Sequence, residues 1–186
     1  GEGLVVTGPP GAGKTTLAFS LAAAGWRLMT DDNLLFRPLG ATSVGSGLRR
    51  LIYATPKTCE RFPDLVARRT GLPNRDGTKE AVELAAPPGQ DPAGPEVPIR
   101  KILFLERGKG ESTSWHPLLA RDAVPLLWRQ AFALQGGEEG RPWFQALTGL
   151  ARTAALVRVE GGADLVTDRS LAERIIADID RQGESP

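Results

Sequence analysis

A glycine-rich motif near the start of the chain constrains its fold more than any other feature. The motif Gly8-Pro-Pro-Gly-Ala-Gly-Lys14-Thr15 directly follows an apolar run at residues 4–7 and precedes an apolar segment at 15–24. The run predicts a buried strand, the glycines a tight loop and the segment a helix. Such a unit turns successive backbone N–H groups toward a polyphosphate at the positive end of the helix. The motif therefore predicts a phosphate-binding loop.

The pattern also assigns roles within the loop. Lys14 is expected to reach the terminal phosphates, and the Thr15 hydroxyl is expected to bind the Mg²⁺ that accompanies them. ATP and Mg²⁺ are the ligands that this interpretation implies. The alternative is a glycine-rich turn that binds nothing. The expected nucleotide-binding residues are Gly8, Pro9, Pro10, Gly11, Ala12, Gly13, Lys14, Thr15 and Thr16.

An acidic pair is the second chemical signal. Asp31 and Asp32 end a strand predicted over residues 26–30, after the first helix. Ligands of open α/β sheets collect at the carboxyl ends of strands, so both side chains are expected to face the nucleotide. Phosphoryl transfer uses a metal ion at the phosphates and a carboxylate that accepts the proton of the attacking hydroxyl, and the two aspartates can divide these tasks. The alternative is that they cap a turn before Asn33.

The composition narrows the class of protein. The 186 residues include 23 basic and 22 acidic side chains, so the net charge of +1 creates no general attraction for nucleic acid. A single cysteine, Cys59, excludes an internal disulfide framework and fits a reducing compartment, which predicts a cytoplasmic location. One histidine, His116, cannot build a multi-histidine metal site. The balanced charge gives no reason to expect nucleic acid as a partner. No apolar stretch approaches the length of a membrane span, so we expect no membrane partner either.

The remaining pattern predicts a mixed α/β domain. Short extended segments separated by close turns favour hairpins rather than further crossover helices. A proline- and glycine-rich stretch at 86–98 predicts a surface loop inside one domain, residues 1–186. The chain opens at Gly1 almost on its first strand, so we expect an N-terminal portion to be missing. Extended segments are predicted at 34–36, 41–44, 48–55, 99–106 and 155–159, and helices at 56–69, 122–132, 142–152 and from the capping box Ser170–Glu173 onward.

Residues 8–32 resemble the catalytic core of bacterial HPr kinase/phosphorylase and its relatives, which include HPr-kinase-like enzymes encoded beside modified peptides, such as lasso-peptide kinases. The likeness covers the loop, the helix, the second strand and the doubled aspartate, with Lys14 and Asp31 seventeen positions apart as in that family. It implies that Lys14 binds phosphate and Thr15 binds Mg²⁺. It also implies that Asp31 is the general base that deprotonates a substrate serine, and that Asp32 is a neighbouring metal-linked group.

The same resemblance implies a P-loop NTP-binding domain related to phosphoenolpyruvate carboxykinase, with a mixed sheet, and is compatible with a homo-oligomer. Two family features are not found. The family's catalytic histidine lies upstream of the loop, a role that His116 does not take over, and the arginine-glycine signature that supplies a glutamate is not recognised here. These departures favour a peptide or small protein, rather than HPr, as the phosphoacceptor.

Three functions therefore follow from the sequence. The first is a Mg²⁺-dependent kinase that moves the γ-phosphoryl group of ATP to a hydroxyl of a peptide or small protein. The second is a small-metabolite kinase of the shikimate or gluconate type, and the third is a nucleotide-binding regulatory module without catalysis. The basic residues of the chain are expected to lie on the solvated surface; for an enzyme, the loop at residues 107–112 is a candidate to carry a cation over the transferring phosphate, and Thr78-Lys79 is a weaker candidate.

Overall fold

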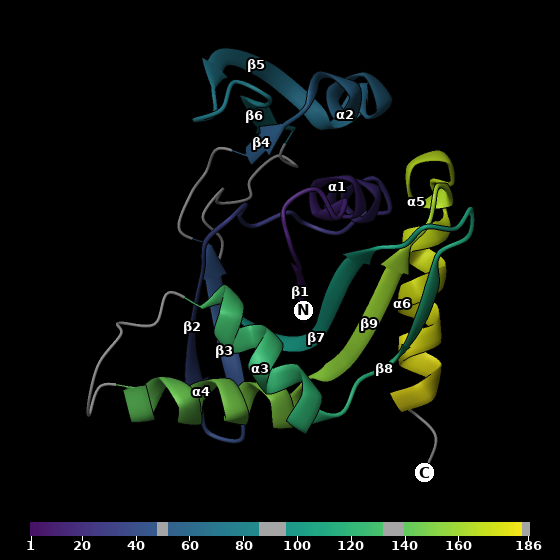
Figure 1. Ribbon diagram of the computed structural model, residues 1–186. Helices are drawn as coiled ribbons and strands as arrows, with labels where there is room; N and C mark the ends of the chain where they lie inside the picture. Colours follow the sequence, from purple (N-terminus) through teal and green to yellow (C-terminus); the bar gives the residue numbers. More distant parts are fainter. Residues whose placement is uncertain (48–51, 86–95, 132–139, 184–186) are drawn as a thin grey trace.

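The computed structural model describes residues 1–47, 52–85, 96–131 and 140–183, which form two sheets with helices between and around them (Figure 1). The larger sheet has the order β2-β3-β7-β9-β8, with β1 also paired to β7, and the smaller has the order β4-β6-β5. The strands of the larger sheet are β1 (Gly3–Thr7), β2 (Leu34–Leu39), β3 (Thr42–Gly47), β7 (Val97–Arg107), β8 (Ser114–Pro117) and β9 (Ala155–Gly161). Those of the smaller are β4 (Ile52–Ala54), β5 (Val66–Pro73) and β6 (Glu80–Leu84).

Strand β7 is the centre of the larger sheet. It runs parallel to β1 on one side and to β9 on the other, while β3 pairs antiparallel with its first residues. Strands β2 and β3 form an antiparallel hairpin, as do β5 and β6 in the smaller sheet. The predicted mixed α/β architecture with hairpins is therefore confirmed.

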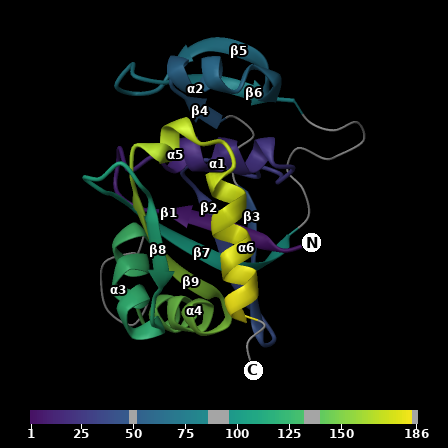
Figure 2. The ribbon, with the colours of Figure 1, turned by 90° about the vertical axis from the view of Figure 1, so that its right-hand side faces the viewer.

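Helices cover both faces of the larger sheet (Figures 1 and 2). On one face, Leu103 and Leu105 of β7 share a core with α1 (Lys14–Ala23) and α6 (Leu171–Gly183). On the other face, Ile102 and Phe104 share a core with α3 (Ala120–Gln130) and α4 (Gly140–Thr153). Successive residues of a strand point to opposite faces, so a strand segment buried on both sides is continuously apolar, as Ile102–Leu105 of β7 is here.

The smaller sheet lies over α1, which is thus enclosed between the two sheets (Figure 2). Phe19 of α1 is fully buried against this sheet, and its ring centroid lies 5.9 Å from that of Phe62. The helical segments α2 (Pro56–Arg61) and η1 (Pro63–Leu65) complete this layer. Thr55 begins α2 by accepting a hydrogen bond from the backbone N–H of Thr58, and Pro56 occupies the first turn, where its missing N–H is not needed.

One predicted element is wrong and another is wrong in its second part. Residues 26–30 form no strand, because Trp26 packs against the core of the larger sheet while Leu28 packs against that of the smaller, and the segment crosses between the two. Of the one or two short helices predicted over 56–69, α2 and η1 are present up to Leu65, but residues from Val66 onward form β5 instead. There, pairing with β6 overrides the local helical preference.

The other predicted elements that the structure describes are present. Strand β7 contains residues 99–106 and β9 contains 155–159, while α3, α4 and α6 match the three predicted later helices. Residues 48–51, 86–95 and Phe132 lie outside the described part of the chain, and Val97 and Pro98 already belong to β7. Within the described ranges, none of the helices has the length and apolar character that crossing a bilayer requires.

Candidate functional site

The glycine-rich loop joins β1 to α1 along a path that requires glycine. Gly8, Gly11 and Gly13 have φ angles of 148°, 76° and 98°. A Cβ atom at Gly8 would lie 2.0 Å from the carbonyl oxygen of Leu105, and one at Gly13 would lie 2.7 Å from Leu165 Cδ2. All three glycines have positive φ, and at Gly8 and Gly13 a Cβ atom would also come closer to its neighbours than Cβ atoms normally do.

The loop directs positive charge toward its own mouth. No described side chain caps the N-terminus of α1, and its first turn contains no acidic residue. The first-turn N–H groups of a helix have no intrahelical acceptor and carry partial positive charge. Lys14 folds back over the loop, where its Nζ donates to the carbonyl oxygens of Gly8 at 2.8 Å and Pro9 at 2.9 Å. The start of α1 thus combines the partial positive charge of its uncapped N–H groups with the ammonium group of Lys14.

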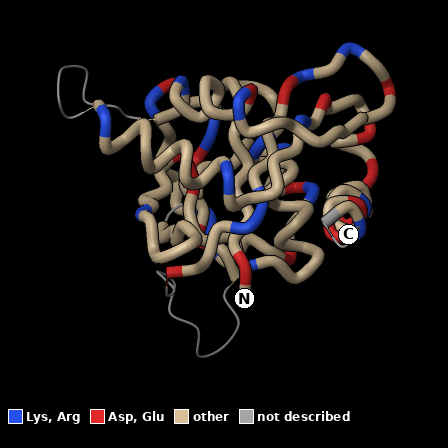
Figure 3. Tube along the Cα trace, turned by 90° about the horizontal axis from the view of Figure 1, so that it is seen from below, with Lys and Arg blue, Asp and Glu red and all other residues tan. Residues whose placement is uncertain are grey.

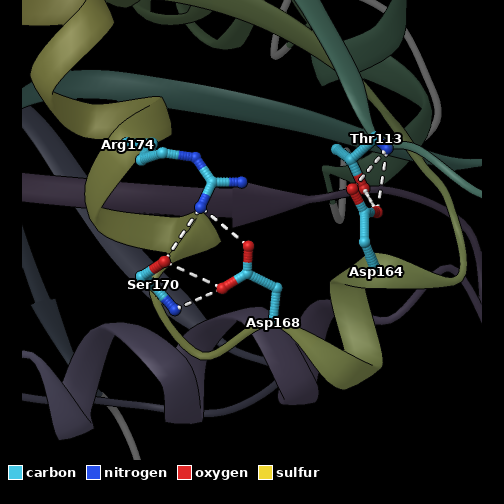
Figure 4. A network of polar contacts seen from close by, with 5 residues as sticks. All are labelled: Thr113, Asp164, Asp168, Ser170 and Arg174. Atoms are coloured by element: carbon cyan, nitrogen blue, oxygen red, sulfur yellow. Dashed lines mark hydrogen bonds and ion pairs between the residues drawn. The ribbon is translucent and has the colours of Figure 1, made fainter.

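A short helix, α5 (Asp164–Thr167), supports the loop from the opposite side. Its Leu165 is buried against Gly13, and hydrogen bonds on either side of it hold the helix in place (Figure 4). Asp164 accepts from the backbone N–H of Thr113 at 2.8 and 2.9 Å and from its hydroxyl at 2.5 Å. Asp168 accepts from the N–H of Ser170 at 2.9 Å and from Arg174 at 2.7 Å.

The acidic pair lies in a turn at the same end of the sheet. Asp32 has a φ angle of 62°, and the backbone N–H of Asn33 donates to the Asp31 carbonyl oxygen at 2.7 Å. The Asp31 carboxylate accepts a hydrogen bond from the backbone N–H of Tyr53 at 2.9 Å. Because the chain has turned, the two side chains are freed from the opposite orientations that a strand would impose. The alternative that the pair belongs to a turn is correct for the backbone.

The charged groups of this region act on one another. Burial raises the pKa of Asp31, as does the charge of Asp32, while the Tyr53 amide and the charge of Lys79 oppose that rise. Burial lowers the pKa of Lys14, and the positive charge of Lys79 lowers it further. Asp32 and Asp31 act in the opposite direction on Lys14. Lys14, the two aspartates and Lys79 therefore form one electrostatic group.

Lys79 comes from the turn of the β5–β6 hairpin, far along the chain from the glycine loop. Its Nζ lies 3.4 Å from the Thr15 hydroxyl. The backbone of Lys79 is held on both sides by Asn74, whose N–H donates to the Lys79 carbonyl oxygen and whose Oδ1 accepts from the Lys79 N–H, each at 2.9 Å. The hairpin turn thus places a second ammonium group at the start of α1.

A cavity of about 360 Å³ opens beside this ammonium. It lies between the acidic turn, the small sheet and the hairpin turn, and its size is at the lower end of the range of ligand pockets, roughly 300–1,000 Å³. Arg75 forms no ion pair with any described residue and is exposed. The residues lining the cavity are Asp32, Tyr53, Pro73, Asn74, Arg75 and Lys79.

The structure brings together the residues predicted for the site, apart from one cation candidate. Lys14 and the acidic pair form the electrostatic group with Lys79, the second of the two cation candidates, and the Lys79 ammonium is hydrogen-bonded to Thr15. The described backbone contacts of the loop at 107–112 are instead with the turn before α5, including Gly108 with Gly161 and Glu111 with Asp164. Cys59 is buried in the small-sheet core.

Sequence reasoning missed Tyr53, Asn74 and Arg75. Tyr53 contributes its backbone N–H, which donates to the Asp31 carboxylate, and a contact made by the backbone cannot be predicted from a pattern of side chains. For Asn74 and Arg75 a signal existed, because Asp76-Gly77 follows them, and that dipeptide favours a tight hairpin turn. Gly77 has a φ of 72°, which such a turn requires.

Metal binding by protein side chains alone is not expected in this region. Within the described ranges, no three His, Cys, Asp or Glu side chains are grouped so that they could hold a metal ion. Mg²⁺ needs only one or two protein oxygens when phosphates and waters supply the rest, so the Thr15 hydroxyl and a carboxylate of the acidic pair are chemically suitable donors.

Acidic and basic residues are interspersed along the chain in the view of Figure 3.

Comparison with known proteins identifies no relative: no protein-family model, curated protein or solved structure matches the chain.

Proposed function

We propose that this chain is an ATP-dependent phosphotransferase of the HPr-kinase-like type, in which the segment from β1 to α1 is a P-loop. It transfers the γ-phosphoryl group to a hydroxyl of a peptide or small protein, preferably to the hydroxyl of a serine. One observation carries the proposal: a loop with positive φ and no room for a Cβ atom at Gly8 and Gly13 folds Lys14 back over the start of α1, within reach of the charge of the half-buried Asp31 carboxylate, which the Tyr53 N–H orients.

The residues of the chain divide the chemistry. The loop amides and Lys14 bind the phosphate tail and neutralise the charge that develops on it. Asp31 accepts the proton of the acceptor hydroxyl as its oxygen bonds to the γ-phosphorus and the bond from that phosphorus to the bridging oxygen breaks. The products are a phosphorylated acceptor, ADP and a protonated Asp31. A raised pKa suits this role because it brings the base nearer to the operating pH.

Thr15 and Asp32 would hold Mg²⁺, which when bound offsets the negative charge of the phosphates. The hydrogen bond from the Tyr53 N–H fixes one oxygen of Asp31. That bond keeps the Asp31 carboxylate oriented, so its other oxygen is available to the acceptor.

The proposal is tested by measuring Mg·ATP binding calorimetrically and following transfer from γ-labelled ATP into peptide and metabolite pools. The wild-type protein should bind Mg·ATP and label peptides. Lys14→Ala should weaken binding and slow transfer by roughly 10²–10³, because one charge-stabilising group carries about that factor. Lys57→Ala is a matched control, since Lys57 is exposed on α2.

Three results would contradict the proposal in different ways. Equal binding of Mg·ATP by the wild type and Lys14→Ala would show that the glycine loop is not the nucleotide-binding site. Label found only in the metabolite pool would favour a small-metabolite kinase. Tight Mg·ATP binding with no transfer to either pool would favour a regulatory nucleotide-binding module.

A further inference from the structure

We propose that Lys79 is a catalytic residue of this transfer: its ammonium binds the transferred phosphoryl group, between the Thr15 hydroxyl and the cavity that receives the acceptor. This inference rests on the proposed function. It assigns to the β5–β6 hairpin a role that the glycine loop cannot fill, because the loop supplies cationic contacts from one side only.

The first argument is position. Lys79 Nζ lies 3.4 Å from the Thr15 hydroxyl, at the first turn of α1. The same residue lines the cavity together with Asp32 and Arg75. If the cavity receives the acceptor, as this inference assigns, a group that lines it and also contacts the start of α1 lies where the phosphoryl group passes from donor to acceptor.

The second argument is charge. The ammonium groups of Lys14 and Lys79 both bond to uncharged oxygens: Lys14 to the carbonyls of Gly8 and Pro9, and Lys79 to a hydroxyl. Lys79 forms no ion pair of its own within the described chain. Two cations directed at one region repel one another, and an anion between them is attracted by both. A phosphoryl oxygen is such an anion, and its hydrogen bonds to ammonium groups are charge-assisted.

The third argument is rigidity. Besides the two hydrogen bonds between Asn74 and Lys79, the turn is closed by bonds from the Gly77 N–H to the Asn74 carbonyl at 3.1 Å and from the Thr78 N–H to Asp76 at 2.9 Å. The backbone from which Lys79 extends is therefore held in place before any ligand binds. Preorganised charge of this kind stabilises a transition state without reorganisation at the moment of reaction.

The experiment compares two probes, Mg·ADP and the non-hydrolysable Mg·AMP-PNP, by calorimetry on the whole chain. Lys79→Met should weaken AMP-PNP binding by about 10- to 100-fold, since a hydrogen bond to a charged group carries energy of that order. Binding of ADP, which lacks the γ-position, should change less than about threefold. Lys79→Arg should restore most of the AMP-PNP affinity, and the control Lys57→Met should change neither ligand.

Thermal unfolding of each variant separates this role from a structural one. If Lys79→Met lowers the melting temperature and weakens both ligands equally, Lys79 only fastens the hairpin to α1 and the inference is wrong. The inference is also wrong if Lys79→Met leaves the ratio of the AMP-PNP and ADP dissociation constants unchanged and only lowers the Mg²⁺ concentration that binding requires. In that case the Lys79 ammonium would only substitute for the metal ion. If the wild type binds neither probe, the proposed function fails as well, whereas binding that depends on Lys14 but not Lys79 refutes this inference alone.

Discussion

The two sides of the candidate site are built differently. The glycine loop rests on the large core between α1, β7 and α6, to which thirteen of the described buried residues belong. The hairpin that carries Lys79 belongs to the small sheet, whose core contains six. Buried apolar contacts set local stability, so we expect the small sheet to open as a unit more readily than the loop side, while the hydrogen bonds within the hairpin turn still fix the backbone of Lys79 relative to its own strands.

This difference indicates a division of labour. The loop side recognises a constant part of the substrate, the phosphate tail, through backbone positions fixed by packing. The hairpin side faces the cavity with long polar side chains such as Arg75, which can be exchanged without disturbing a core. Asp31 joins the two sides, because it neighbours the loop while its carboxylate is oriented by β4 of the small sheet.

The largest effect is expected at this junction. Asp31→Asn removes the base but keeps an oxygen that accepts from Tyr53, so transfer should slow by about 10²–10⁴ while the Kd of Mg·ATP changes little. Steady-state kinetics with calorimetric binding measure both quantities. Asp64→Asn, at an exposed position on η1, is the control. A parallel loss of affinity and rate would assign Asp31 to the metal site instead.

The contrast between the two sides is tested directly by the same substitution in each. Gly8→Ala places a methyl group against the Leu105 carbonyl, so its loss of unfolding free energy should exceed about 4 kcal/mol. Gly77→Ala meets no atom within 4 Å and should lose only the strain of its φ of 72°, about 1–2 kcal/mol. Urea denaturation gives both values. Equal losses would mean that the loop is no more tightly packed than the hairpin.

A smaller effect concerns the stability cost of Asp31. Burial raises the pKa of Asp31 in the folded protein, so folding favours the protonated carboxyl. The free energy of unfolding is therefore highest below the unfolded pKa, about 3.9, and falls as pH rises from there through the folded pKa. Asp31→Asn should therefore melt at a higher temperature than the wild type at pH 7, with the difference shrinking toward pH 3. Thermal unfolding across this range checks it; a variant that is less stable at pH 7 contradicts it.

The smallest effect is expected at the start of α6, on the loop side. Hydrogen bonds from Arg174 and Ser170 lower the pKa of Asp168 to about 2. Its contribution is therefore present above the unfolded pKa, about 3.9, and is lost as pH falls through about 2. Asp168→Asn should lower the melting temperature slightly at pH 7, and this difference should shrink as pH falls toward 2 and vanish below it. A difference independent of pH would mean that shape, not charge, holds this network together.

Local patterns predicted the fold of the loop side well. The glycine loop, α1 and the central strand β7 are each coded by a continuous segment whose periodicity and turn residues agree with the fold. The hairpin side was predicted poorly. Residues 66–69 carry no strong alternation, and they form a strand only because Leu84 and Val82 pair with them.

By itself, the sequence determined the chemical groups available: a glycine loop ending in Lys14 and Thr15, an acidic pair, and a mixed α/β chain. The tertiary structure alone decided which of the remaining charges joins them. Lys79 stands 64 residues after Thr15 along the chain, yet its ammonium is hydrogen-bonded to that residue's hydroxyl because the small sheet packs on Phe19 of α1. Contacts between such distant residues depend on the packing of whole elements, which no local pattern encodes.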